Sequence, residues 1–171
     1  MKQCIVVLMF LLCCSCAKRP VLPVIDLDYI SVSGRDDRST LNIKFASKTD
    51  VLNFFQNATG ESQLGEALYC SLDRRVEFED FDRLTQYLVG NLVEVESSEH
   101  GMAHVYVSKL SALKKEDEGV SNVFMLPGEL LTALNERDTV SCRVFTSAYS
   151  SGGHYSKPML IPANDLVRAI Q

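Results

Sequence analysis

The sequence predicts a mainly β protein, an antiparallel β-sandwich with two or three short helices. Segments in which apolar and polar residues alternate recur along the chain, which is typical of strands with one buried face. Polar turn sequences separate these segments at short intervals, as they do in sandwiches. The segments with helical apolar spacing are few and short, so helices are expected to be accessory elements.

The first elements are predicted as a hairpin followed by a short helix. Residues 25–33 and 40–47 alternate and flank a polar turn, which indicates two paired strands. Ser47 and Asp50 resemble a helix capping box, and the apolar residues after them predict a helix that ends by Gly60.

The remaining elements follow from the same patterns, except in 74–82, which is rich in charge and has no assigned element. They are a strand over 67–72, two strands or one bent strand over 84–95 with a break at Gly90-Asn91, a strand over 102–110, a charged turn over 114–119, a strand over 120–126, a helix over 130–134 opened by Pro127, a strand over 139–146, a loop over 148–156, a strand over 159–161 and a helix that starts in 162–165. Trp is absent, so the core is expected to depend on Leu, Val and Ile.

The N-terminus has the pattern of a secretory signal. Lys2 precedes an apolar run over 5–12, and a small residue, Ser15, precedes Cys16. The run is too short to span a bilayer, which takes about 20 residues. The cysteine makes the segment resemble a bacterial lipoprotein signal, in which cleavage exposes a cysteine that receives palmitate and other acyl chains. Cys16 is the candidate lipidated residue; Cys14 is the alternative acceptor, and an ordinary cleaved signal is the other interpretation.

The resemblance divides the chain into a signal peptide over 1–15, a lipidated tether over 16–23 and a single periplasmic β-rich domain over 24–171. In bacterial lipoproteins an Asp after the lipidated cysteine favours retention in the inner membrane. Ala17 stands there in this chain, so the resemblance implies an outer-membrane lipoprotein that faces the periplasm.

The mature chain is acidic. Without Lys2 it keeps 16 basic and 22 acidic residues, a formal net charge of −6. Nucleic acids and anionic membrane surfaces attract basic patches, so we expect no nucleic acid partner. Contact with the membrane is expected through the N-terminal acyl chains instead.

Cysteine use predicts one disulfide. Three of the six cysteines lie in the predicted signal and Cys16 carries lipid, which leaves Cys70 and Cys142 in an oxidising compartment. A Cys70–Cys142 disulfide would close a loop of about 70 residues and contribute about 4 kcal/mol. Two buried free thiols are the alternative.

Residues for catalysis are not grouped in the sequence. His100 and His104 have a metal-ligand spacing only on a helix, and they lie in a predicted turn and strand. No Gly-x-Ser-x-Gly elbow or phosphate loop is present. The carboxylates occur in runs of like charge that indicate a solvated face: Glu77, Glu79, Asp80, Asp82, Glu116, Asp117 and Glu118. We therefore expect no enzyme, no metal site and no cofactor.

A loop rich in Tyr, Ser and Gly over 149–155 is the candidate contact with a protein partner. Its candidate residues are Tyr149, Ser151, His154 and Tyr155. Tyr supplies rigid amphipathic contact area, and Ser and Gly adapt their hydrogen bonds to a partner. A plain mobile hairpin tip is the alternative.

Three features together resemble a known class of protein. They are the lipoprotein signal around Cys16, the Cys70 and Cys142 pair, and the stretch over 140–162, which cover the signal and roughly the C-terminal third. The chain resembles the immunity lipoproteins that protect bacteria from type VI secretion phospholipase effectors. The resemblance implies a protein that binds a cognate secreted lipase toxin in the periplasm and blocks its active site. A structural outer-membrane lipoprotein of an envelope or secretion complex is the alternative, and an envelope enzyme or small-ligand carrier would need a deep pocket.

Overall fold

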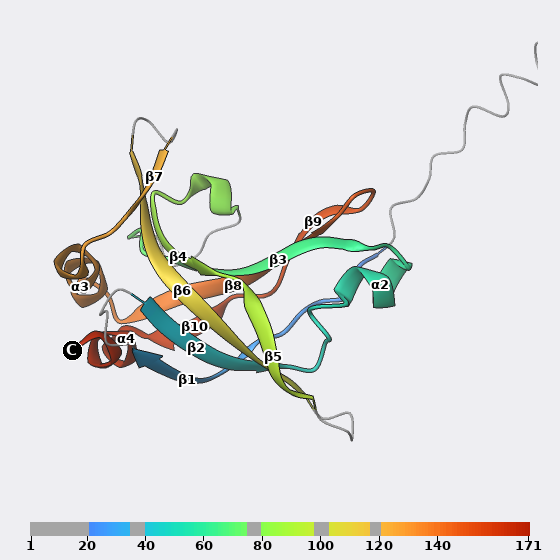
Figure 1. Ribbon diagram of the computed structural model, residues 1–171, viewed down its shortest axis with the longest axis horizontal. Helices are drawn as coiled ribbons and strands as arrows, with labels where there is room; N and C mark the ends of the chain where they lie inside the picture. Colours follow the sequence, from blue (N-terminus) through green and yellow to red (C-terminus); the bar gives the residue numbers. More distant parts are fainter. Residues whose placement is uncertain (1–20, 35–39, 75–79, 98–102, 117–120) are drawn as a thin grey trace, which may run out of the picture.

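The structure, a computed structural model, describes residues 21–34, 40–74, 80–97, 103–116 and 121–171 (Figure 1). These residues form one antiparallel sheet of ten strands with three short α-helices and one 3₁₀ helix. The predicted mainly β class is confirmed.

In chain order the elements are β1 (Asp28–Gly34), β2 (Thr40–Ser47), α2 (Phe54–Thr59), β3 (Gln63–Ser71), the 3₁₀ helix η1 (Phe81–Arg83), β4 (Gln86–Gly90), β5 (Leu92–Ser97), β6 (His104–Glu116), β7 (Ser121–Phe124), α3 (Pro127–Asn135), β8 (Thr139–Ala148), β9 (Gly152–Tyr155), β10 (Met159–Pro162) and α4 (Ala163–Ile170).

The predicted sandwich is not shown by the described residues, because all ten of their strands belong to a single hydrogen-bonded sheet. The strand order is β1-β2-β6-β4-β3-β8-β10, with β5 and β7 on β6 and β9 on β8. The sheet curls, so β1 contacts β10 and the backbone N–H of Lys157 donates to the carbonyl of Ile25 at 2.9 Å. Alternation in the sequence reports one buried face per strand, and a curled sheet has the same pattern as two stacked sheets.

β6 is the longest strand of the described sheet, with thirteen residues, and pairs with four other strands. One edge pairs first with β2 and then with β7, and the other pairs first with β5 and then with β4. The predicted break at Gly90 between two strands is confirmed. A Cβ at Gly90 would lie 2.0 Å from the backbone oxygen of Lys109, so only glycine allows this close approach to β6.

The local predictions for the N-terminal half are mostly confirmed. The first hairpin forms from β1 and β2, and α2 ends at Gly60, whose φ of 76° is left-handed. The capping box is wrong: Ser47 Oγ accepts from the N–H of Thr49, while Asp50 Oδ1 accepts from the N–H of Asn53 at 3.1 Å. α2 therefore begins later than expected, at Phe54.

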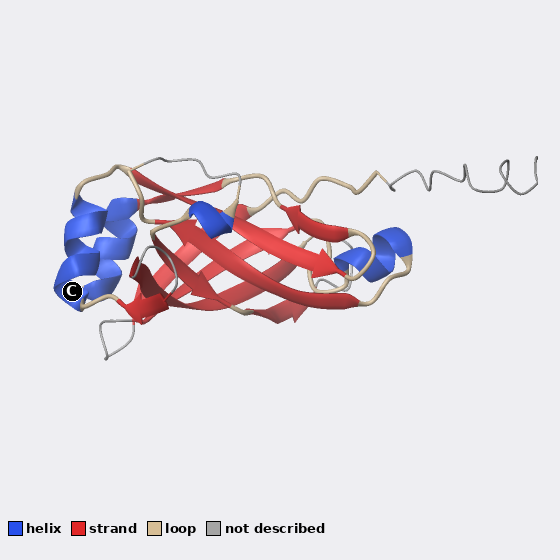
Figure 2. Cartoon of the chain, turned by 90° about the horizontal axis from the view of Figure 1, so that it is seen from above, coloured by secondary structure: helices blue, strands red, loops and turns tan. Residues whose placement is uncertain are grey.

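A closed core fills the curl of the sheet. α2 covers one end of the molecule, and α3 and α4 cover the opposite end (Figure 2). The expectation of a core of Leu, Val and Ile is incomplete, because the largest fully buried side chains include four aromatic residues: Tyr106, Phe45, Phe54 and Phe55. Aromatic side chains bury the most area per residue, so a few of them carry much of the packing.

Replacing Tyr106 by phenylalanine is expected to lower the free energy of unfolding by about 1–3 kcal/mol. The Tyr106 hydroxyl accepts from the buried N–H of Val51 at 2.9 Å, and its removal leaves that donor unpaired. Urea unfolding at 25 °C measures the loss. Tyr87→Phe is the control, because the Tyr87 hydroxyl bonds the exposed side chain of Asn122, where water can replace it. Equal losses in both variants would contradict the assignment.

Candidate functional site

The predicted disulfide is confirmed. Cys70 on β3 and Cys142 on β8 are directly opposed cross-strand neighbours, and their sulfur atoms are bonded. Both residues are fully buried, so the bond joins β3 to β8 within the core, close to the end of β3. Cys14, Cys16, His100 and the carboxylates within 75–79 and 117–120 lie outside the described residues.

The predicted loop over 148–156 is wrong in type, because β8 and β9 form a hairpin there with a tip at 149–151. Gly152 has a φ of 76° and allows the tight turn into β9. The carboxylate of Glu61 accepts from the backbone N–H groups of Ser150 and Ser151 and from Ser151 Oγ at 2.7 Å. These bonds hold the tip in place.

Successive residues of β9 point to opposite faces of the sheet, as they do in any strand. The ring of His154 stacks on Phe54 of α2, with centroids 4.9 Å apart, and donates to the backbone carbonyl of Pro23, since proline has no N–H. Burial lowers the pKa of His154, because desolvation penalises its charged form. His154 therefore joins the N-terminal segment to the hairpin.

Tyr155 belongs to an aromatic cluster on the other face of the sheet. Its ring packs 4.9 Å from Phe145, and its hydroxyl accepts from the N–H of Phe81 at 3.2 Å and donates to Asp80. Burial raises the pKa of Tyr155 to about 12. Of the four predicted partner residues, Tyr149 alone is largely exposed, at 90%, while the other three make contacts within the fold.

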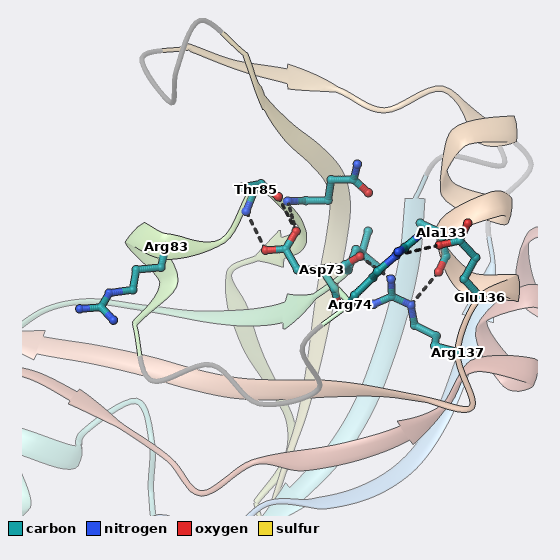
Figure 3. Close-up of a pocket in the computed structure, with 9 residues that line it drawn as sticks. Asp73, Arg74, Arg83, Thr85, Ala133, Glu136 and Arg137 are labelled. Carbon is teal, nitrogen blue, oxygen red and sulfur yellow. Dashed lines mark hydrogen bonds and ion pairs between the residues drawn. The ribbon is translucent and has the colours of Figure 1, made fainter.

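A charged hollow of about 550 Å³ lies where the end of β3 meets α3 (Figure 3). Its lining residues come from three separate parts of the chain: Leu72, Asp73, Arg74, Arg83, Thr85, Gln86, Ala133, Glu136 and Arg137. Among the described lining residues, three arginines and two carboxylates give a formal charge of +1, in a chain of net charge −5. The charged hollow is the strongest candidate for a site that the sequence patterns did not identify.

The side chain of Asp73, on one side of the charged hollow, makes structural hydrogen bonds. Its carboxylate accepts from the N–H and the hydroxyl of Thr85 and from the N–H of Gln86 at 3.0 Å. These bonds hold the start of β4 against the end of β3. The carboxylate therefore acts as a backbone cap and is poorly placed to act as a base.

The side chain of Arg137 also makes structural hydrogen bonds. Its guanidinium donates to the backbone oxygens of Ala133, Ser71, Leu72 and Asp73, so it joins the last turn of α3 to the end of β3. Burial lowers the pKa of Arg137, but a guanidinium stays charged in proteins. The helix carbonyl that it binds would otherwise lack a partner.

Arg74, Arg83 and Glu136 are exposed at the rim of the charged hollow. Arg74 Nε lies 3.8 Å from Glu136 Oε2, and the Arg74 side chain is 90% exposed. Arg83 lies apart from the other side chains in Figure 3. This arrangement can attract an acidic or polar surface, and the described residues of the hollow do not form the nucleophile, base and orienting group of a catalytic set.

No group of three His, Cys, Asp or Glu side chains that could hold a metal ion lies among the described residues. His104 instead bonds Glu94 Oε1 at 2.8 Å. In the described part of the chain no helix is long and apolar enough to span a membrane.

Comparison of the chain with protein-family models, with curated proteins and with solved structures returned no match.

Proposed function

We propose that this protein is a periplasm-facing, outer-membrane lipoprotein that binds and neutralises a type VI secretion lipase or phospholipase toxin. The observation that supports this class most directly is the Cys70–Cys142 disulfide. Disulfides persist in oxidising compartments such as the bacterial periplasm, which agrees with the lipoprotein signal predicted over 1–15.

The internal bonds of the polar side chains favour binding over catalysis. Asp73, Arg137 and Glu61 each satisfy several backbone groups, and Tyr155 and His154 pack against neighbouring rings. A rigid scaffold with little freedom in its polar groups suits a preorganised binding surface. A tether at the membrane would also raise the local concentration of an inhibitor where a lipase acts.

Two surfaces are candidates for the toxin. The first is the hairpin tip with Tyr149, and the second is the charged hollow with Arg74 and Arg83 at its rim. They lie at opposite ends of β3 and β8, because Gln63 pairs with Ala148 at one end and the charged hollow begins at Leu72 beyond the other.

A pull-down with a lipase encoded beside this chain tests the proposal. The chain from Ala17 onward is mixed with the lipase, and binding and phospholipase activity are measured. Stoichiometric binding with loss of lipase activity supports an immunity protein. Arg83→Glu and Tyr149→Ser then identify the contact surface, with the exposed Asn135→Ser as a matched control. Absence of binding would move the assignment to the alternative, a structural lipoprotein of an envelope or secretion complex.

Replacing Cys16 by alanine is expected to release the protein from the outer membrane or to block its processing, because the acyl acceptor is lost. Membrane fractionation followed by mass determination of the N-terminus measures the change. Cys14→Ala is the control and is expected to leave both unchanged. Unaltered fractionation of Cys16→Ala would contradict the anchor, and release by Cys14→Ala alone would move it to Cys14.

A further inference from the structure

The described chain begins at the end of the molecule that carries α2 and the tip of the β8–β9 hairpin (Figure 1). Leu22 packs against the core, and the carbonyl of Pro23 accepts from the ring of His154. Two further contacts hold the next residues, since the N–H of Lys157 donates to Ile25 and its ammonium lies 2.9 Å from Asp26. The point at which the N-terminal segment leaves the domain is therefore fixed.

Large apolar side chains are exposed near this same point. Val21 is 98% exposed, Tyr149 at the hairpin tip 90% and Leu64 66%. Leu64 follows Gln63, which pairs with Ala148 directly before the tip, so Leu64 on β3 lies next to the hairpin tip that carries Tyr149. Exposed apolar side chains also occur next to α3, where Phe124 is 75% and Leu126 67% exposed, so exposure alone does not select the end that faces a membrane.

The length of the tether limits what this end can face. Only four residues separate Cys16 from Val21, and a fully extended chain spans about 17 Å over those five steps. β3 and β8 carry the opposite end about 30 Å farther away, since each residue of a strand adds about 3.3 Å. An acyl chain on Cys16 would therefore bring the α2 and hairpin end to the bilayer and keep the charged hollow away from it.

We infer that the acylated protein contacts the bilayer through the end that carries α2 and the β8–β9 hairpin tip. At this end Val21, Leu64 and Tyr149 contact lipid. The charged hollow at the α3 end then faces the periplasm and is the surface left for the toxin. Tyrosine suits this position, because its ring is amphipathic and is enriched at membrane interfaces. The inference rests on the lipid anchor of the proposed function.

Tryptophan fluorescence tests the orientation, because the chain contains no natural Trp. Two full-length, lipidated variants, Tyr149→Trp and Asn135→Trp, are reconstituted separately into phosphatidylethanolamine–phosphatidylglycerol vesicles that contain brominated lipid as a quencher. Asn135 is the matched position, because it is an exposed residue at the end of α3. Flotation of the vesicles on a density gradient reports the anchor independently of the fluorescence.

The expected result is that both variants float with the vesicles and that Tyr149→Trp is quenched several-fold more strongly than Asn135→Trp. Flotation with equal quenching, or with stronger quenching of Asn135→Trp, would overturn the orientation and leave the anchor intact. Loss of flotation by both variants would overturn the anchor and the orientation together. An unquenched Tyr149→Trp whose emission changes on addition of the lipase would assign the hairpin tip to the toxin.

Discussion

A variant with both Cys70 and Cys142 replaced by alanine is expected to unfold with a free energy about 4 kcal/mol below that of the parent. The bond joins residues 72 positions apart, and closing a loop of that length removes much of the entropy of the unfolded chain. A loss of this size corresponds to a fall in Tm of roughly 10 °C for a domain of about 150 residues. Urea and thermal unfolding under oxidising conditions measure it.

The parent in reductant is the control that isolates the bond. Alanine at two fully buried positions also removes two sulfur atoms from the core, which adds the cost of a small cavity. Reduction breaks the bond and keeps both sulfur atoms, so the reduced parent is expected to fall between the oxidised parent and the double variant. Identical melting of the parent with and without reductant would show that the bond does not contribute to stability.

Most strands could be predicted because each depends on the pattern of its own residues, and the disulfide could be predicted from the number of cysteines. An alternating segment reports its own buried face, and the two cysteines that lie beyond the predicted signal and the predicted lipidated residue, Cys16, form one possible pair. The arrangement of the strands depends on interactions between distant residues. β6 continues through Lys114, Lys115 and Glu116, which the sequence predicted as a turn. Lys114 reaches Glu129 on α3, and Lys115 donates to the backbone oxygen of Asp82, so distant partners stabilise these charges on the strand.

The β8–β9 hairpin also depends on interactions between distant residues, so it could not be predicted from its own sequence. A run of Tyr, Ser and Gly has the composition of a mobile loop, and composition alone does not report tertiary contacts. The hairpin tip is held by Glu61, about 90 positions earlier in the chain, and β9 is held by the stacking of His154 on Phe54. Neither partner could be identified from the residues of the loop itself.

The charged hollow was missed for a related reason. Its residues come from the turn after β3, from the stretch between η1 and the start of β4, and from the end of α3, and no motif or spacing joins these three parts. Arg137 lies in a short charged run, where an arginine usually indicates solvent exposure. Its four carbonyl partners are backbone atoms, which leave no pattern in the side-chain sequence.

Replacing Arg137 by methionine is expected to lower the free energy of unfolding by about 2–3 kcal/mol. Hydrogen bonds to charged groups each stabilise a fold by about 1.5–3 kcal/mol, and the charged hollow is open, so water can replace some of those that Arg137 makes. Methionine keeps most of the aliphatic length of the side chain, so the loss of unfolding free energy measures the contribution of the guanidinium group. Urea unfolding at 25 °C measures it.

Arg83→Met is the matched control, because it removes the same charge from the same hollow at an exposed position. Its effect on stability is expected to stay within about 0.5 kcal/mol, as for most surface substitutions. Binding separates the two residues further. If the charged hollow is the toxin surface, Arg83→Met weakens binding at unchanged stability, while Arg137→Met acts through the position of the α3 terminus and lowers both. Equal stability of the two variants would show that water replaces the four carbonyl bonds completely, and that the α3 terminus does not need Arg137 to stay on β3.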